Sequence, residues 1–318
     1  MRISGMFVAA LGATLLSLGA NAACAAVARA WVSGHGVDRA GCGAPTAPCR
    51  SLQYAQDNIV ATGGEIDILD PAGYGAITID KALSIVNDGV GTAGVQQTGS
   101  GQDAISINAG PTDAITLRGL TIDGLGAAKD GVGLAEAGQL TMVNCVIRRF
   151  AHDGVYLQQA TGVLRLSVLN SIATDNTGDG FGVAPANGGQ ILGVIDHSAA
   201  ITNGQNGVLV SGLATASSDN AWITIANSDI SSNVGDGIHA EGKSMNAIAF
   251  AREDISDFNH VGYYIDVGAE MYLSRTEALN NAASAVFIDD VDGALAFSSG
   301  DNAFAGFVHG ALTPNANQ

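Results

Sequence analysis

Acidic residues that stand directly before a glycine are the first group in this chain that could do chemistry. Carboxylates stacked about one strand spacing apart repel one another unless a cation or a proton lies between them. Oxygen ligands of this kind suit calcium. The candidate calcium ligands are Asp130, Asp153, Asp179 and Asp236, with Asn206 in the corresponding place. Asp-Gly is also a common sequence of tight turns, so a purely structural role is the alternative.

The cysteines form a second group with possible chemistry. Cys42 and Cys49 flank the short segment Gly-Ala-Pro-Thr-Ala-Pro, and in an exported protein such a pair is expected to be oxidised. We therefore predict a disulfide between Cys42 and Cys49. Cys145 falls in a column that should face inward, which favours a buried apolar role over that of a nucleophile. Cys24 is expected to leave with a signal peptide.

A repeat of about twenty-five residues must position these groups. Apolar residues alternate in short runs such as Leu140-x-Met142 and Leu166-x-Val168, which indicates strands with one buried face. A glycine after each run is expected to form a left-handed turn. The repeat therefore predicts an all-β, single-stranded right-handed parallel β-helix, in other words a solenoid. The predicted turn glycines are Gly131, Gly154, Gly180, Gly207, Gly237 and Gly262, which are 23, 26, 27, 30 and 25 residues apart.

Two columns of residues are expected at one corner of the coils. The first should face inward and consists of Leu120, Cys145, Ser171, Ser198 and Ser228. The second stands one residue earlier and contains Asn144, Asn170, His197 and Asn227. Because amides at a spacing of roughly 4.8 Å can hydrogen-bond along the axis, we expect this second column to stack inside the turn.

The ends of the chain have their own patterns. Residues 1–25 are predicted to be a secretory signal peptide, because Arg2 precedes an apolar run and several alanines. Residues 26–50 form an N-terminal segment with the disulfide loop, residues 51–308 the β-helix, and residues 309–318 a flexible tail. A cap helix is predicted at 51–62, with Ser51 as its N-cap and Leu52, Ala55 and Ile59 on one face. A helix in this place should cover the open end of the solenoid.

The charge balance limits the possible partners. The chain has 13 basic and 30 acidic residues and a formal net charge of −17, which would repel nucleic acid and anionic membranes. The N-terminal apolar run is too short for a membrane span. Aromatic residues make up 5% of the chain, fewer than we expect on a surface that binds neutral sugars by stacking. These features indicate an acidic exported protein, either periplasmic or extracellular.

Several segments resemble a known family. Cys49-Arg-Ser-Leu-Gln-Tyr-Ala, the segment 64–74 and the coil 117–124 resemble the pectin-lyase-like superfamily. More narrowly, the chain is similar to exported bacterial right-handed parallel β-helix repeat proteins of unassigned activity. Polygalacturonase-like members carry Gly-His-Gly and Asp-Asp together with Asn-Thr-Asp and Arg-Ile-Lys. Here His35 lies before the cap helix, and Asp289-Asp290 lacks both companion motifs, so the hydrolase signature is incomplete.

The resemblance to pectate-lyase-like members implies a different chemistry. In that group carboxylates hold calcium against a uronate, and an arginine or lysine abstracts a proton that the metal helps to acidify. Carried over to this chain, the resemblance implies Arg148 or Arg149 as the base, close to His152 and to the aspartates before the glycines. The alternative is that these arginines lie on the surface and pair with Asp153 or Asp175.

Two functions therefore remain. The first is a non-catalytic exported scaffold of a surface or matrix, or one that binds carbohydrate; it is favoured because the catalytic motifs are incomplete. The second is a calcium-dependent lyase or epimerase that acts on a uronate-containing polysaccharide. A polysaccharide is the expected partner in both cases, and calcium is the expected cofactor of the second.

Overall fold

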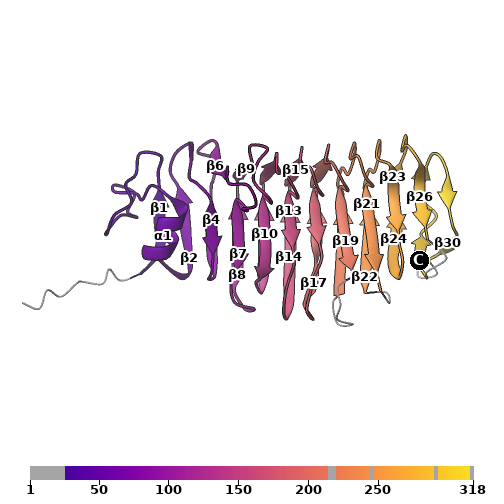
Figure 1. Cartoon of the computed structure of the whole chain (residues 1–318), viewed down its shortest axis with the longest axis horizontal. Helices are drawn as coiled ribbons and strands as arrows, with labels where there is room; N and C mark the ends of the chain where they lie inside the picture. Colours follow the sequence, from indigo (N-terminus) through magenta and orange to yellow (C-terminus); the bar gives the residue numbers. More distant parts are fainter. Residues whose placement is uncertain (1–25, 214–219, 244–245, 290–292, 316–318) are drawn as a thin grey trace, which may run out of the picture.

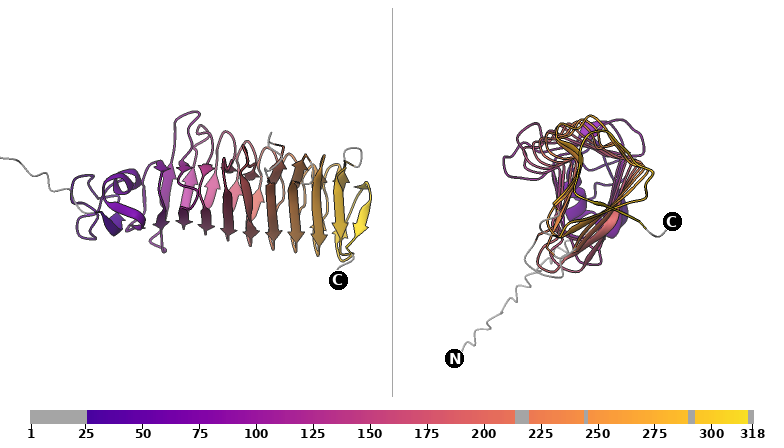
Figure 2. Two further views of the ribbon diagram at one scale, coloured as in Figure 1. Left: turned by 90° about the horizontal axis from the view of Figure 1, so that it is seen from below. Right: turned by 90° about the vertical axis from the view of Figure 1, so that its right-hand side faces the viewer.

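The chain folds into a long solenoid of stacked coils (Figure 1). The computed structural model describes residues 26–213, 220–243, 246–289 and 293–315; the predicted signal peptide lies outside them. All pairs of neighbouring strands in these residues are parallel. The end-on view in Figure 2 shows successive coils following one common cross-section. The predicted right-handed parallel β-helix is confirmed.

Three parallel sheets form the walls of the solenoid, and we name them sheets I, II and III. Sheet I contains β1 (Val27–Val32), β2 (Val60–Ile68), β5 (Leu83–Val86), β8 (Ala114–Arg118), β11 (Gln139–Val143), β14 (Val163–Leu169), β17 (Gln190–Asp196), β20 (Asn220–Ala226), β22 (Ala247–Arg252), β24 (Ala269–Ser274), β27 (Leu295–Ser298) and β30 (Leu312–Pro314). Sheet II contains β4 (Ile77–Ile79), β7 (Ile105–Asn108), β10 (Val132–Glu136), β13 (Val155–Leu157), β16 (Phe181–Val183), β19 (Val208–Gly212), β21 (Ile238–Gly242), β23 (Val261–Ile265), β26 (Ser284–Ile288) and β29 (Val308–His309). Sheet III contains β3 (Ala72–Gly73), β6 (Ala93–Gln96), β9 (Leu120–Asp123), β12 (Val146–Arg148), β15 (Ile172–Thr174) and β18 (Ala199–Ile201), and single bridges continue it to β25 (Glu277–Ala278) and β28 (Ala303–Phe304).

The corner between sheets I and III turns on one residue. In four coils the residue at this corner belongs to the predicted second column. The φ angles of Asn144, Asn170, His197 and Asn227 are 54°, 49°, 48° and 51°. Asparagine tolerates this left-handed conformation better than most residues. Asn144, Asn170 and His197 are exposed. The expected stack of amides inside this turn was therefore wrong, because a left-handed residue between two strands directs its side chain away from the core here.

A ladder of buried asparagines exists elsewhere, before the strands of sheet II. The side-chain Nδ2 of Asn176 donates to Oδ1 of Asn203 at 3.0 Å, Asn203 donates to Asn233 at 3.0 Å, and Asn233 donates to Asn259 at 3.0 Å. These four side chains are at most 3% exposed. Each amide is satisfied by the next coil, so the polar groups stay in the interior without a desolvation penalty.

The six repeat glycines are required for a steric reason. None of them has a positive φ, so the expected left-handed turn at these positions was wrong. A Cβ on Gly180 would lie 2.9 Å from Nδ2 of Asn203, and one on Gly207 would lie 2.8 Å from Nδ2 of Asn233. The backbone oxygen of the next repeat glycine would be equally close, at 2.7 Å from Gly180. In five of the six coils the glycine therefore makes room for the asparagine of the following coil, whereas a Cβ on Gly131 would meet Phe150.

The predicted inward column is confirmed. Leu120, Cys145, Ser171, Ser198 and Ser228 are at most 5% exposed. The backbone N–H of Cys145 donates to Oγ of Ser171 at 3.1 Å, and Ser171 and Ser198 donate in the same way to the next serine at 3.2 Å. Asp254 continues the column and accepts from the N–H of Ser228 at 2.9 Å. Burial raises the pKa of Asp254 to about 7.

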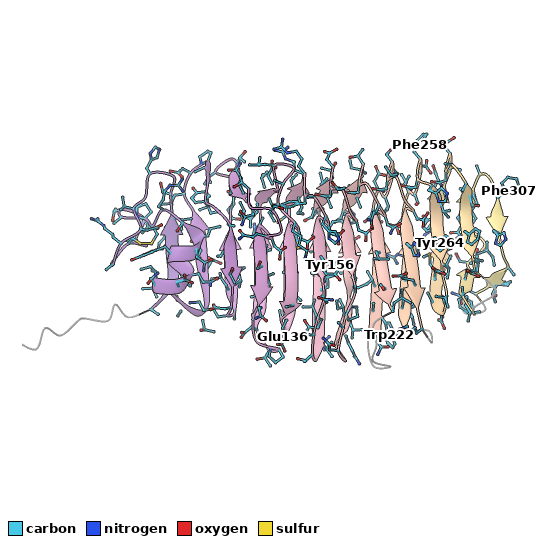
Figure 3. All side chains as sticks on the ribbon, viewed as in Figure 1. Glu136, Tyr156, Trp222, Phe258, Tyr264 and Phe307 are labelled. Carbon is cyan, nitrogen blue, oxygen red and sulfur yellow. A yellow bond between two sulfur atoms is a disulfide. The ribbon has the colours of Figure 1, made fainter. Side chains whose placement is uncertain are left out.

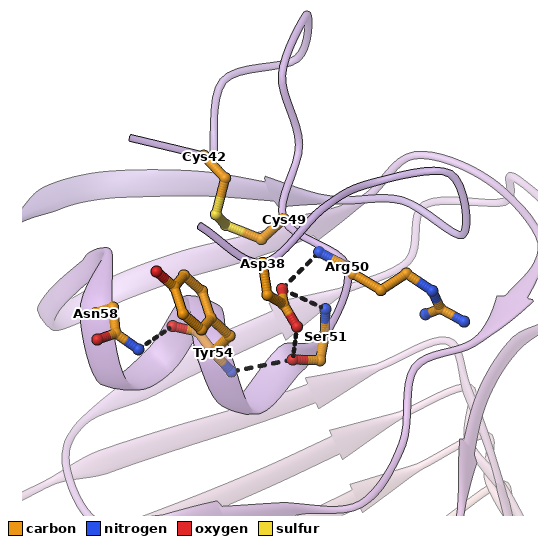
Figure 4. Close-up of a disulfide and its surroundings, with 7 residues drawn as sticks. All are labelled: Asp38, Cys42, Cys49, Arg50, Ser51, Tyr54 and Asn58. Carbon is orange, nitrogen blue, oxygen red and sulfur yellow. Dashed lines mark hydrogen bonds between the residues drawn. A yellow bond between two sulfur atoms is a disulfide. The ribbon is translucent and has the colours of Figure 1, made fainter. Parts of the chain in front are cut away.

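A short helix and a disulfide lie at the N-terminal end (Figure 4). Cys42 and Cys49 are bonded, with a Cα–Cα distance of 5.0 Å, so the predicted disulfide is confirmed. Asp38 accepts the N–H and O–H of Ser51, and Ser51 Oγ caps α1 (Leu52–Asn58) by accepting the N–H of Tyr54. The helix is shorter than the predicted 51–62, because Val60 pairs with Val27 and begins β2.

The C-terminal end also differs from the prediction. Strands β29 and β30 continue the coils as far as Pro314, beyond the expected end of the β-helix at residue 308. Among the described residues, no helix has the length and apolar character needed to cross a membrane.

We predict that the asparagine ladder, and not the exposed asparagine column, stabilises the fold. Asn203→Ala should lower the free energy of unfolding by about 2–4 kcal/mol, because it leaves buried partners unsatisfied. Asn170→Gly is the control and should change it by less than about 1 kcal/mol, since glycine accepts a positive φ. Denaturant unfolding of both variants measures the difference. Equal losses in the two variants would contradict the assignment of the ladder.

Candidate functional site

The aspartates predicted as calcium ligands lie just before the strands of sheet II and form a hydrogen-bonded column. Oδ1 of Asp130 accepts the backbone N–H of Asp153 at 3.0 Å, and Oδ1 of Asp153 accepts that of Asp179 at 2.7 Å. In the same way, Oδ1 of Asp179 accepts the backbone N–H of Asn206 at 2.8 Å, and Oδ1 of Asn206 accepts that of Asp236 at 2.9 Å. One oxygen of each side chain is therefore occupied in holding the next coil. Asn206 performs the same task without a charge.

Burial and mutual repulsion disfavour the charge on this column. Burial, followed by the charge of Asp179, raises the pKa of Asp153 to about 7. Burial also raises the pKa of Asp179. Burial and then the charge of Asp130 raise the pKa of Asp103, one coil earlier. Asp153 can thus take up a proton near neutral pH.

Two basic side chains, Lys129 and His152, lie beside the N-terminal part of this column. Lys129 Nζ is 2.7 Å from Oδ2 of Asp130 and 5.6 Å from the centroid of the Tyr156 ring. His152 Nδ1 is 2.9 Å from Oδ1 of Asp130 and 3.3 Å from Oδ2 of Asp153. Ligand atoms of Asp130, His152 and Asp153 lie within 4.8 Å of one another, so these three residues could hold a metal ion. The hydrogen bond to Asp130 raises the pKa of Lys129, which makes this lysine a poor base.

The arginines proposed as bases are held elsewhere. Nε of Arg148 and Nε of Arg149 each lie 3.0 Å from a carboxylate oxygen of Asp123. The expected pairing of these arginines with Asp153 or Asp175 was wrong, because strand pairing between β9 and β12 places Asp123 beside Arg148. The hydrogen bond to Asp123 raises the pKa of Arg149. A guanidinium held in this way keeps its proton and is unsuited to abstract one.

A polar groove runs along the outer face of sheet II near its N-terminal end. It consists of two adjoining hollows of about 400 Å³ and 240 Å³ that share Asp103 and Ser106. Gln53, Thr78 and Gln102 line the first hollow, and Asn108, Lys129, Tyr156 and Gln158 line the second. The side chains are mainly amides and hydroxyls, which both donate and accept hydrogen bonds.

Tyr156 occupies an unusual place in this groove. Strand register places Gly133 and Gly182 on either side of it in the adjacent coils. The carboxylate of Asp103 covers Gly133, since a Cβ there would lie 2.2 Å from Oδ2. Gly182 has no side chain to cover the ring on the other side. Within the residues described, Oδ1 of Asp103 is buried without a hydrogen-bond partner. An aromatic ring thus stands beside an unsatisfied acceptor.

Five outward aromatic residues and His309 stack in rows in the C-terminal coils, a feature that the composition did not indicate. In sheet II, Tyr264 and Phe287 stack at 5.0 Å, and Phe287 and His309 stack at 4.4 Å. In sheet I, Phe250, Tyr272 and Phe297 stack at 4.9 and 4.6 Å. Their faces cover each other, so these rows stabilise the coils and present mainly ring edges. Figure 3 shows Tyr156 and Tyr264 on the same face of the solenoid.

The remaining sequence candidates lie away from the groove. Cys145 is fully buried, as predicted, and burial raises the pKa of its thiol to about 11. His35 lies in the loop between β1 and α1. The backbone N–H of Asp289, just after β26, donates to the carbonyl of Ile265 at 2.9 Å, whereas Asp290 lies outside the described residues.

Comparisons with known proteins support the fold. Residues 68–221 match the family model described as "Right handed beta helix region". The structure is similar to that of pectate lyase Pel9A, with a TM-score of 0.65 and 15% sequence identity over 86% of this chain and 75% of that chain. A search of the curated proteins found no match. These findings agree with the resemblance to the pectin-lyase-like superfamily in fold.

We predict that Asp153 makes stability depend on pH. Its raised pKa means that the folded state binds more protons than the unfolded state between about pH 4 and 7, so stability falls as pH rises through 7. Asp153→Asn should keep the bond to Asp179, as Asn206 does, and remove this charge. We expect it to be more stable than the wild type at pH 8 by about 1–4 kcal/mol.

Melting temperatures at pH 5.5 and 8 measure this effect. The wild type should lose more stability than Asp153→Asn between the two values. Asp175→Asn, at an exposed position, is the control and should behave like the wild type. If the melting temperature of Asp153→Asn changes with pH as much as that of the wild type, a group other than Asp153 causes the pH dependence.

Proposed function

We propose that this right-handed parallel β-helix protein, which shares its fold with a pectate lyase, is an exported, non-catalytic scaffold that binds a neutral polysaccharide. The polar groove on sheet II is the proposed binding surface. It is a shallow hollow that extends over several coils, as a polymer would require. Two acidic residues, Asp103 and Asp130, line it, and Lys129 is paired with Asp130, which favours a neutral sugar over a uronate.

The pair Asp103 and Tyr156 carries the proposal. Oδ1 of Asp103 is a buried acceptor without a partner, and a sugar hydroxyl is a suitable donor for it. Beside it, the ring of Tyr156 offers an apolar surface; Gly182, its neighbour in the next coil, has no side chain, and Lys129 Nζ lies 5.6 Å from the ring centroid. Sugars combine hydroxyl groups with apolar C–H faces, so they match both groups at once.

The pairing of the basic and acidic side chains that a lyase would need supports the non-catalytic function. Arg149 is paired with Asp123, and Lys129 with Asp130, so both cations are stabilised in their protonated forms. One oxygen of Asp130, Asp153 and Asp179 accepts a backbone N–H. A proton-abstracting base and a free set of carboxylates are both needed for calcium-assisted elimination.

Export fits the disulfide between Cys42 and Cys49, because disulfides persist in oxidising compartments. The proposed location is the periplasm or the cell exterior, with residues 1–25 as the signal peptide.

We predict that Tyr156 is required for binding of neutral glycans. Binding to a panel of neutral cell-wall and storage polysaccharides should detect at least one ligand, and calorimetry with its oligosaccharide should show a loss of at least tenfold in Tyr156→Ala. Tyr156→Phe should retain binding because it keeps the ring. Tyr264→Ala is the matched control, since its ring lies on the same sheet but is covered by Phe287.

Two results would count against this binding surface. One is a panel in which no neutral glycan binds, and the other is a ligand whose affinity is equal in the wild type and Tyr156→Ala.

The alternative is the calcium-dependent lyase or epimerase, which the cluster of Asp130, His152 and Asp153 favours. We expect the wild type with calcium to release no unsaturated products from polyuronates, as measured by their ultraviolet absorbance. Product release that calcium chelation stops, and that Asp179→Asn abolishes in a folded protein, would establish the lyase instead.

A further inference from the structure

His239 has an unusual environment on the outer face of sheet II, three coils beyond Tyr156. Register places Gly182, Leu209 and His239 in succession along this row. The imidazole is largely buried, and its side chain is 17% exposed. Its Nε2 atom is buried and has no hydrogen-bond partner within the part of the chain that the structure describes. A buried nitrogen without a partner is costly unless something binds it.

Two carboxylates lie beside this nitrogen. Glu241 follows His239 by two residues on β21, and Asp266 directly follows Ile265, which pairs with Ala240 in the register of β21 and β23. Oδ1 of Asp266 accepts the N–H of Val267 at 2.7 Å, whereas Oδ2 lies 3.7 Å from Nε2 of His239. Ligand atoms of all three residues lie within 4.8 Å of one another.

The distance between His239 and Asp266 suits a metal ion better than a hydrogen bond. At 3.7 Å the two atoms are too far apart for a good hydrogen bond. Two ligands at about 2.1 Å from a tetrahedral zinc ion are separated by roughly 3.4 Å. A small inward movement of these partly exposed side chains would give that separation.

The other ring nitrogen of His239 is already oriented. Nδ1 lies 3.1 Å from Oδ2 of Asp236, and Oδ1 of Asp236 accepts the N–H of Val261 at 3.2 Å. The Tyr264 ring packs against the imidazole at 4.5 Å. A carboxylate that accepts Nδ1–H leaves Nε2 as the atom with a free lone pair, which is the usual arrangement around a metal-binding histidine.

The charges in this region attract a cation. Asp236, Glu241 and Asp266 place three carboxylates around the imidazole of His239. A divalent metal ion at Nε2 would bind beside these carboxylates.

We propose that His239, Glu241 and Asp266 bind a divalent transition-metal ion, for which zinc is the expected occupant. One imidazole and two carboxylates form a ligand set that suits zinc, whereas calcium prefers oxygen ligands alone. Three protein ligands leave one position of a tetrahedral shell open to water. Asp236 acts as a positioning residue that orients the histidine. This site is separate from the polar groove and does not depend on the proposed binding of glycans.

Calorimetric titration of zinc into the full chain tests the proposal, with the protein purified without a polyhistidine tag and treated with a chelator. We expect one tight site, which His239→Ala weakens by at least 100-fold. Asp236→Asn should weaken it by roughly 10–100-fold, as removal of such orienting partners usually does. His260→Ala is the matched control, because His260 Nδ1 also contacts Asp236, at 3.3 Å, but its side chain is 61% exposed.

A second variant and a second metal ion test the same site. If His239→Ala does not fold, Asp266→Asn replaces it and should weaken zinc binding by at least tenfold with an unchanged circular dichroism spectrum. Calcium in place of zinc should bind at least 100-fold more weakly at this site. The proposal is overturned if zinc does not bind, if His239→Ala binds it as tightly as the wild type, or if His152→Ala alone removes the binding.

Discussion

The structure depends on polar side chains that are satisfied by the next coil along the solenoid axis. The interior contains an asparagine ladder in which Asn176, Asn203 and Asn233 each donate to the following amide. It also contains serines that accept backbone N–H groups across coils. A single coil could not bury these groups, since their partners lie outside it. Stacking therefore supplies both the hydrogen bonds and the apolar core, which explains why such coils are stable only as an array.

The same constraint determines what the acidic residues can do. Asp153 and Asp179 stand where the sequence predicts calcium ligands, but each uses an oxygen to bind the next coil, and Asn206 takes the same place in the column. Their burial destabilises the ionised form, so the column contributes to stability in a way that depends on pH. Recognition is consequently assigned to outward groups that axial bonding does not occupy. Asp103 and His239 are two of the three described residues with a buried side-chain atom that lacks a partner; the third is Gln56, in α1.

Regular stacking also brings together outward residues that are distant in the sequence. Tyr264, Phe287 and His309 are more than twenty residues apart in succession, yet they form one stacked row. The low aromatic content therefore understates the aromatic surface of the C-terminal coils. Tyr156 differs because glycines occupy its row in both adjacent coils. The choice of residue in adjacent coils, and not the number of aromatic residues, decides which ring is accessible to a ligand.

The sequence alone determined the repeat, the strands, the inward serine column, the buried Cys145 and the disulfide between Cys42 and Cys49, because alternation, spacing and loop length are local properties. It also contained a sign of the inner ladder, since Asn176, Asn203 and Asn233 each stand four residues before a repeat glycine. Only the tertiary structure decided which asparagine column is buried, why Gly180 must be glycine, and that Asp123 holds Arg148 and Arg149. These outcomes depend on contacts between coils, whose register and corner geometry are set by packing along the axis and not by any one repeat.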